Sequence, residues 1–221
     1  MDPSDPAYAG QELYSRAFLR IYDPLILGFY GNVVWRCPTS RLVQHYARHV
    51  GHRHLDVGPG TGYFLEHARL ARDTQITLLD PNRDVLAHAA RRLAHLHPWT
   101  LQADVLKPLP VPAGQRFDSA ALNYVLHCLP GPPERKAAAV QHVAAVLQPG
   151  GVLFGATVLG AAGPHTQLSR AVLWFVNRRR FFDNLGDTEA GLRDMLAESF
   201  AQVAIEVVGS VAVFAAHSRD S

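Results

Sequence analysis

The amino-acid sequence predicts an α/β fold in which a mostly parallel β-sheet holds a small ligand at one edge. Between about residues 52 and 216, short apolar runs typical of strands alternate with segments of helical periodicity. The first run ends at Asp56 and is followed by three glycines at alternating positions, Gly58, Gly60 and Gly62. A second run ends 24 residues after Asp56, at Asp80. Because a glycine turn lets backbone amides approach a ligand closely, these two strand ends predict a nucleoside-bearing molecule.

Seven segments have the composition of strands. They are His52–Val57, Gln75–Leu79, Trp99–Gln102, Phe117–Leu122, Val152–Val158, Ala201–Val208 and Val211–Ala216. Only Gly209 and Ser210 separate the last two, and a two-residue connection of this type is typical of a tight hairpin. We therefore expect the last two strands to be antiparallel neighbours in the sheet.

Helical patterns fill the intervals between the strands. Residues 63–71, 83–96 and 134–147 are expected to form helices, and Gln148-Pro-Gly-Gly151 ends the third of these. Residues 1–50, rich in aromatic side chains from residue 11 onward, are expected to form a small N-terminal helical cap. Residues 51–221 would then form the ligand-binding domain. Within that domain, residues 160–198 are expected to form an insertion with helices of its own, which would serve as a lid.

Composition narrows the class of protein. A length of 221 residues favours one main domain, and a hydrophobic fraction of 48% is sufficient for a buried core. The 21 Lys and Arg residues nearly balance the 19 Asp and Glu residues, which gives little support to a nucleic-acid partner. Two cysteines, a polar N-terminus and apolar runs too short to span a bilayer favour a cytoplasmic protein without metal or membrane association.

The spacing of the glycines discriminates between nucleotide classes. A dinucleotide turn prefers Gly-x-Gly-x-x-Gly, whereas this chain has Gly-x-Gly-x-Gly. A phosphate-binding P-loop would require Gly-Lys-Ser/Thr, which does not follow here. An acidic residue at the end of the second strand, Asp80, is suited to accept hydrogen bonds from both hydroxyls of an unphosphorylated ribose. Together these features disfavour a nicotinamide oxidoreductase.

These residues resemble the motifs of class I S-adenosylmethionine-dependent methyltransferases. The resemblance extends from about residue 50 to the C-terminus and begins with Leu55-Asp-Val-Gly-Pro-Gly-Thr-Gly62. It implies a Rossmann-like seven-stranded sheet with helices on both faces and an antiparallel strand inserted beside the fifth. It also implies that Asp80 holds the ribose, that Asp104 and Val105 read the adenine, and that residues 147–153 turn from a helix into the fifth strand. The cofactor implied is S-adenosylmethionine, with S-adenosylhomocysteine as product.

Other positions near these motifs are candidate cofactor ligands. Asp56 either caps the turn or meets the ammonium group of the methionine portion, directly or through water. Asn123, at the end of the fourth strand, is expected to face the same portion of the ligand. The remaining predicted cofactor contacts are Gly58, Pro59, Gly60, Gly62, Pro81 and Asn82.

Catalytic groups are harder to recognise, because methyl transfer requires a base only when the acceptor must lose a proton. The candidate base or orienting residues are His127, Tyr22 and His165. His127 is equally compatible with a packing role. No Asn/Asp-Pro-Pro-Tyr stretch follows the fourth strand, which disfavours methylation of a nucleobase amine or a glutamine side chain.

Aromatic side chains in the cap and the insertion are expected to form the walls of an acceptor pocket. The candidate substrate contacts are Tyr14, Tyr22, Tyr30, Trp174 and Arg178. Arg178 either belongs to a solvated helix end or grips an anionic group of the acceptor. Such a pocket suits a small aromatic or apolar molecule.

The sequence therefore predicts methyl transfer to an O, N or C atom of a small metabolite of secondary metabolism, by a monomer or homodimer. Two alternatives stay open. An RNA or protein methyltransferase would need a basic groove or an added recognition domain. A protein that binds S-adenosylmethionine without transferring its methyl group would keep the same motifs.

Overall fold

A computed structural model describes residues 21–219 and contains a seven-stranded sheet in the order β3-β2-β1-β4-β5-β7-β6. The strands are β1 (Arg53–Val57), β2 (Gln75–Asp80), β3 (Trp99–Gln102), β4 (Phe117–Asn123), β5 (Leu147–Val158), β6 (Gln202–Val208) and β7 (Val211–His217). The first five are parallel, and β7 is antiparallel to both β5 and β6. The predicted α/β fold is confirmed, including the antiparallel strand beside the fifth.

The order of the strands places a crevice at the centre of the sheet. From β1 the chain proceeds outward through β2 and β3, then returns to place β4 on the other side of β1. At such a reversal of strand order, the loops at the carboxyl ends of the two strands diverge and leave room for a ligand. The glycine turn that follows β1 lies at this point.

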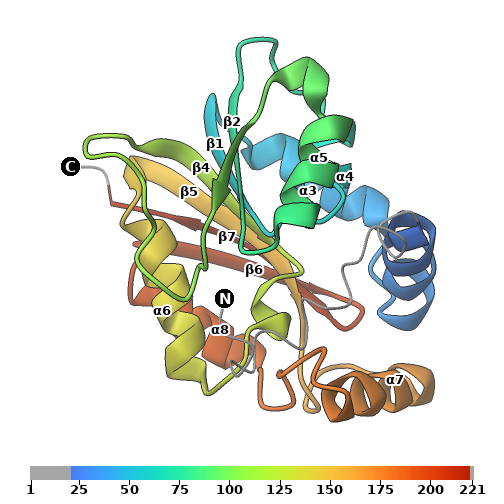
Figure 1. Ribbon diagram of the computed structural model, residues 1–221. Coiled ribbons are helices and arrows are strands. Elements are labelled where there is room, and N and C mark those ends of the chain that lie inside the picture. The colour runs from blue at the N-terminus through green and yellow to red at the C-terminus, as the bar shows by residue number, and fades with distance from the viewer. Residues whose placement is uncertain (1–20, 220–221) are drawn as a thin grey trace.

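Helices cover both faces of the sheet (Figure 1). One face packs against α3 (Thr39–His49), α4 (Tyr63–His67) and α5 (Arg83–Arg92), around a core that includes Tyr46, Leu78 and Phe154. The other face packs against α6 (Pro133–Ala144) and α8 (Glu189–Ala197), around a core that includes Leu122 and Phe214. Strands β1, β4 and β5 are buried along most of their length, as expected for the central strands of a sheet that helices cover on both faces.

The segments expected to form the cap and the lid meet at one end of the sheet. The π-helix η1 (Asp23–Val34) contacts α7 (Gln167–Arg178), and the two lie near each other in Figure 1. In contrast, α8, which also falls within residues 160–198, packs against α6, β6 and β7. Its apolar side chains Leu192 and Leu196 are buried in the core, so this helix is part of the sheet's covering layer.

Several boundaries differ from those expected from the sequence. The helix expected over residues 63–71 ends at His67, and a single 3₁₀ turn, η2 (Ala94–Leu96), follows α5. A second 3₁₀ turn, η3 (Leu126–Cys128), follows β4. The fifth strand begins at Leu147 because that residue already pairs with Phe117, before the glycines expected to precede the strand. Among residues 21–219, no helix has the length and hydropathy needed to cross a membrane.

Candidate cofactor and acceptor site

Two adjoining pockets lie at the carboxyl ends of β1, β2 and β4. The larger is lined by most of the predicted cofactor contacts: Gly58, Gly60, Asp80, Pro81, Asn82, Asp104, Val105 and Asn123. The smaller contains Asp56, Pro59 and Thr61 and shares Tyr22, Gly58, Gly60, Asn123 and Tyr124 with the larger one. The fold thus brings together groups from four separate strand ends.

The glycine turn is shaped by contacts that a side chain would prevent. Gly58, Gly60 and Gly62 all have positive φ angles, of 67°, 55° and 78°. A Cβ atom on Gly58 would lie 2.7 Å from Cγ2 of Val125, which is closer than such atoms approach in proteins. The Gly58 amide donates to the Leu79 carbonyl over 2.8 Å, which extends the pairing of β1 and β2 to the edge of the pocket. Glycine is therefore required here for both conformation and space.

Two buried carboxyl groups face the site from adjacent strands. Asp80 accepts a hydrogen bond at Oδ1 from the Asn82 amide over 2.7 Å. Burial raises the pKa of Asp80 to about 7, against the lowering effect of that hydrogen bond. Burial also raises the pKa of Asp56 to about 7, although a hydrogen bond from Tyr46 lowers it. Buried carboxylates need polar partners, which the ribose hydroxyls and the ammonium group of the predicted cofactor would supply.

Asp104 and Asn82 also have local structural roles. Asp104 Oδ1 accepts from the Leu106 amide over 2.9 Å, which fixes the turn after β3 beside the pocket. The side chain of Asn82 caps α5 by accepting from the Asp84 amide over 2.9 Å. Val105 is positioned by a contact of its backbone, since its carbonyl oxygen lies 2.9 Å from Nδ1 of His142. Each contact leaves the residue at the pocket wall in a defined orientation.

Asn123 and Tyr124, at the end of β4, present buried polar atoms with no well-formed hydrogen bond among residues 21–219. The side-chain nitrogen and oxygen of Asn123 are buried, and neither has a hydrogen-bond partner within residues 21–219. The buried hydroxyl of Tyr124 meets the geometry of a hydrogen bond with none of these residues, and its neighbour Cys37 is a weak partner. Tyr124 also has a φ of 58°, a strained conformation for a non-glycine residue. These groups therefore fit a bound ligand at the junction of the two pockets.

Tyr22 is held over the glycine turn by the residue that follows it. Asp23 accepts from Thr61 Oγ1 over 2.5 Å and pairs with Arg92 over 2.5 Å. Arg92 in turn pairs with Glu66 through a second nitrogen. This network joins the start of η1 to the glycine turn and to α5. Tyr22, which lines both pockets, is thereby fixed at their entrance.

The two candidate histidines lie outside the lining of these pockets. His127 is buried, and its Nδ1 accepts from the Val158 amide over 3.2 Å. Burial, with a smaller effect of Lys136, lowers its pKa to about 3. His165 contacts the carbonyls of Leu159 and Gly160 through Nε2, at 3.1 and 2.9 Å. Both rings therefore hold backbone segments in place.

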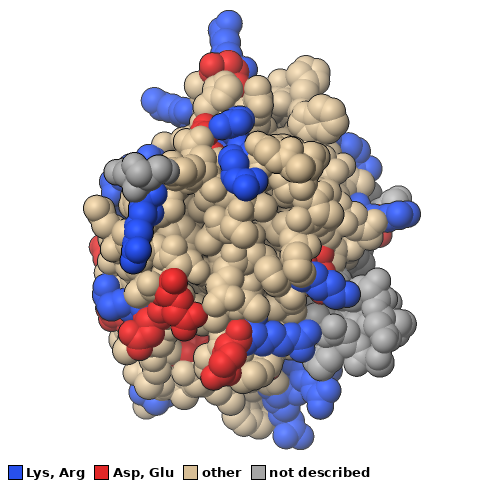
Figure 2. All heavy atoms as spheres, turned by 90° about the vertical axis from the view of Figure 1, so that its left-hand side faces the viewer, with Lys and Arg blue, Asp and Glu red and all other residues tan. Residues whose placement is uncertain are grey.

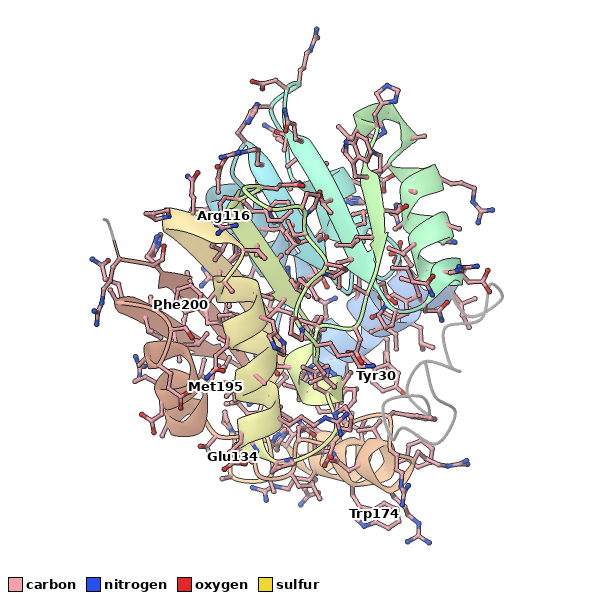
Figure 3. All side chains as sticks on the ribbon, turned by 60° about the vertical axis from the view of Figure 1, so that its left-hand side comes forward. Tyr30, Arg116, Glu134, Trp174, Met195 and Phe200 are labelled. Carbon is pink, nitrogen blue, oxygen red and sulfur yellow. The ribbon has the colours of Figure 1, made fainter. Side chains whose placement is uncertain are left out.

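The predicted acceptor contacts are distributed differently from the cofactor contacts. Tyr30, within η1, is half-buried and packs against the core. Trp174 is exposed on α7, with the Arg178 guanidinium 5.5 Å from its ring centre, and it points away from the body of the protein in Figure 3. Tyr14 lies outside the described residues. Of the predicted acceptor contacts within residues 21–219, Tyr22 alone lines the two pockets.

Comparison with known proteins agrees with this geometry. A family model described as a methyltransferase domain matches residues 55–153. Demethylluteothin O-methyltransferase of Streptomyces thioluteus is 38% identical over 212 residues, which cover 96% of this chain and 92% of that protein. The chain belongs to the class I S-adenosylmethionine-dependent methyltransferases. Its predicted cofactor is thereby confirmed, and the chain is an enzyme that transfers a methyl group from S-adenosylmethionine to a small molecule.

Other relatives of this methyltransferase differ in the element they methylate. The physcion biosynthesis cluster O-methyltransferase of Aspergillus chevalieri is 36% identical over 96% of each chain. The N-methyltransferase vrtF of Penicillium aethiopicum is also 36% identical, over 96% of this chain and 89% of its own. The solved structure of the N-methyltransferase NodS from Bradyrhizobium japonicum, in complex with S-adenosylhomocysteine, aligns with a TM-score of 0.64 at 16% identity. It covers 97% of this chain and 99% of its own, and at that identity it supports the fold alone.

Tyr124 is the main site residue absent from the sequence-based candidates. It directly follows Asn123 at the strand end, so the position of that strand end was a signal that could have identified it. Cys128 also lines the larger pocket, but burial raises the pKa of its thiol to about 12, so it remains protonated. Thr61 lies within the glycine turn, but its contact with Asp23 depends on a segment distant in sequence, so no sequence pattern shows it.

Proposed function

We propose that this methyltransferase transfers the methyl group to a hydroxyl oxygen of an aromatic or apolar small metabolite of secondary metabolism. The observation that carries the proposal is the buried Tyr124 hydroxyl, which has no well-formed hydrogen bond within residues 21–219 and lies in an apolar stretch of the pocket wall. That wall includes Val125, Cys128 and Leu129. An apolar wall with few polar groups selects a ligand that is largely apolar and orients it through one or two hydrogen bonds.

The cofactor contacts follow from the geometry of the strand ends. The Asp80 carboxylate would accept the ribose hydroxyls, and Asp104 with Val105 would receive the adenine. Gly58 and Gly60 would lie against the methionine portion, whose ammonium group would meet Asp56. When bound, S-adenosylmethionine supplies a methyl group that is activated for displacement by the positive charge on sulfur.

Catalysis by the protein's own residues is proposed to consist of orientation and exclusion of water, with the acceptor bound as its phenolate or enolate after its hydroxyl proton has been lost to solvent. Tyr22 and Tyr124 face the junction of the two pockets, and we assign them to hold the acceptor oxygen in line with the methyl group. Burial and the neighbouring Cys37 and Tyr22 raise the pKa of Tyr124 well above its usual value, so its hydroxyl stays a hydrogen-bond donor. Residues 160–187 with η1 would close the entrance, as cap and lid.

A small molecule is the favoured class of acceptor over a nucleic acid. On the face of the protein shown in Figure 2, the Lys and Arg side chains are separated by uncharged surface and lie close to acidic groups. Two relatives named as O-methyltransferases of biosynthetic pathways support an oxygen acceptor. The proposal also includes a reducing, cytoplasmic setting, since Cys37 and Cys128 are both free thiols, and a monomer or homodimer.

A methylation screen tests the proposed acceptor. The enzyme is incubated with methyl-labelled S-adenosylmethionine and matched sets of phenols, amines and carboxylic acids, and the products are identified by mass spectrometry. Transfer to phenolic or enolic hydroxyls is expected. Transfer to amines alone would contradict the oxygen assignment, and S-adenosylmethionine binding without transfer to any acceptor class would favour the non-methylating alternative.

Single-turnover measurements then separate the candidate catalytic residues. Substitution of Tyr22 or Tyr124 by Phe is expected to slow methyl transfer, because each hydroxyl is assigned to the acceptor. His127→Phe and His165→Phe are expected to lower the stability of the protein more than the rate of methyl transfer, since both rings hold backbone segments. A large rate loss in stably folded His127→Phe would instead assign that residue as the base.

A further inference from the structure

A line of buried polar side chains runs through the core from the end of α3 to the site. Tyr46 Oη lies 3.0 Å from Asp56 Oδ2 and 2.6 Å from His54 Nε2. His54 Nδ1 lies 2.8 Å from the Ser119 oxygen, which accepts from the Gly51 amide over 2.7 Å. Tyr46, His54 and Ser119 are all 0% exposed. None of these three side chains lines the pockets, so the line reaches the site only through Asp56.

One arrangement of protons satisfies every member of this line. The Gly51 amide can only donate, so the Ser119 oxygen accepts from it and its own proton is directed to His54 Nδ1. The neutral imidazole then carries its proton on Nε2 and donates to the Tyr46 oxygen. Tyr46 in turn donates to Asp56, whose carboxylate, when ionised, can only accept. In the reverse arrangement, the Ser119 proton would have no acceptor among the side chains of the line.

Burial keeps the imidazole of this line neutral, and packing fixes the orientation of its rings. Burial lowers the pKa of His54 to about 3, so the ring is neutral near pH 7. The Tyr46 ring stacks on Phe64 at 5.9 Å and meets Phe154 edge-on at 5.1 Å, while His54 stacks on Phe154 at 5.7 Å. The aromatic contacts fix where the Tyr46 hydroxyl points. Its hydrogen bond also lowers the pKa of Asp56, in opposition to burial.

We infer that Tyr46, His54 and Ser119 are positioning residues that hold the Asp56 carboxylate, ionised and oriented, to receive the ammonium group of the methionine portion. This inference rests on the proposed cofactor contact of Asp56. The carboxylate lines the smaller pocket on one side and is held by Tyr46 on the other. The role of these residues is therefore exerted through Asp56 alone, without contact with the cofactor.

The decisive experiment compares two ligands that differ only at the ammonium group. Binding of S-adenosylhomocysteine and of its desamino analogue, which has hydrogen in place of the amino group, is measured by calorimetry. Tyr46→Phe is expected to lower the affinity for S-adenosylhomocysteine about tenfold, because the hydrogen bond from Tyr46 to the charged Asp56 carboxylate is lost. The affinity of this variant for the desamino analogue is expected to stay within about twofold of that of the unmodified enzyme, since this ligand has no ammonium group for Asp56 to contact.

A second variant and a control protect this test from effects on folding. Ser119→Ala, at the far end of the line, is expected to show the same selective loss with a smaller factor. Ser218→Ala removes a hydroxyl whose hydrogen bonds within residues 21–219 go to the Gln148 and Gly151 carbonyls, and it should change neither affinity. Thermal unfolding verifies that each variant is folded at the temperature of the assay.

The outcomes distinguish this inference from the proposed site. If Tyr46→Phe and Ser119→Ala lose affinity equally for both ligands, these residues have a general structural role and the inference is overturned. Unchanged affinity for both ligands would also overturn it. If the unmodified enzyme binds the two ligands with equal affinity, Asp56 does not contact the ammonium group. That result would contradict the proposed cofactor contact and therefore also the inference that rests on it. Selective loss for the amino-bearing ligand in both variants supports it.

Discussion

Substitution of Asn123 by leucine is expected to raise the free energy of unfolding of the ligand-free protein and to lower its affinity for the cofactor. Both polar atoms of the Asn123 side chain are buried without a partner in residues 21–219. Such a group costs about 1–3 kcal/mol, so an apolar side chain branched at the same carbon should raise the free energy of unfolding by about 1 kcal/mol. Two hydrogen bonds lost from the complex, at about 0.5–1.5 kcal/mol each, weaken binding by roughly 5- to 150-fold.

Urea unfolding without ligand and calorimetry with S-adenosylhomocysteine measure the two effects separately. The matched control is Asn184→Leu, because Asn184 is buried to a similar degree but its amide donates to the Val158 carbonyl over 2.8 Å. This variant should lose about 1–3 kcal/mol of stability, because partners are left unsatisfied, and should bind the ligand as before. If Asn123→Leu is destabilised like the control and keeps its affinity, Asn123 does not face the cofactor and the reasoning is refuted.

Two further predictions concern the strand ends. Because burial raises the pKa of Asp56 and Asp80 to about 7 and the bound ligand favours their ionised forms, S-adenosylhomocysteine affinity should fall as pH decreases below that value. Below that value the affinity should fall by nearly tenfold per pH unit for each carboxyl group that must ionise, and above about pH 8 it should be constant. A calorimetric affinity that does not change with pH would contradict this prediction. Gly58→Ala should lose more unfolding free energy than Gly114→Ala, since both have positive φ but only Gly58 lacks space for a Cβ. The Gly114 variant alone should cost about 1–2 kcal/mol, and equal losses in urea unfolding would show that the contact is unimportant.

Much of the fold followed from local patterns. Short apolar or alternating runs predicted the strands, because the central ones present apolar side chains to the covering helices. The edge strands β3 and β6 are largely exposed or half-buried. The Gly209-Ser210 turn predicted the terminal hairpin. The start of the fifth strand was missed because Leu147 pairs through the sheet with Phe117, a contact distant in sequence. The core position of α8 was also not evident, since a helix within an insertion has the same periodicity whether it packs on a lid or on the sheet.

Most of the predicted cofactor contacts line one pair of adjoining pockets, whereas Tyr22 alone of the predicted acceptor contacts within residues 21–219 does so. Ligand-binding glycines and strand-end acids occur at fixed spacing because one strand-turn-helix unit supplies them. Side chains that meet across the fold have no such spacing. His127 and His165 looked suitable as bases by residue type, yet their ring nitrogens contact Val158 and the 159–160 carbonyls.

The sequence by itself determined the fold class, the family resemblance and the cofactor, because those depend on short segments whose residues act together locally. Only the tertiary structure revealed which polar groups lack partners and which are held by others. It brought Tyr46, from a helix before the sheet, to the Asp56 carboxylate. It also placed Asn123 and Tyr124 at the pocket junction, where their polar atoms have no well-formed hydrogen bond among the described residues. Burial and hydrogen bonding between distant segments set these properties, and neither is encoded in the spacing of residues along the chain.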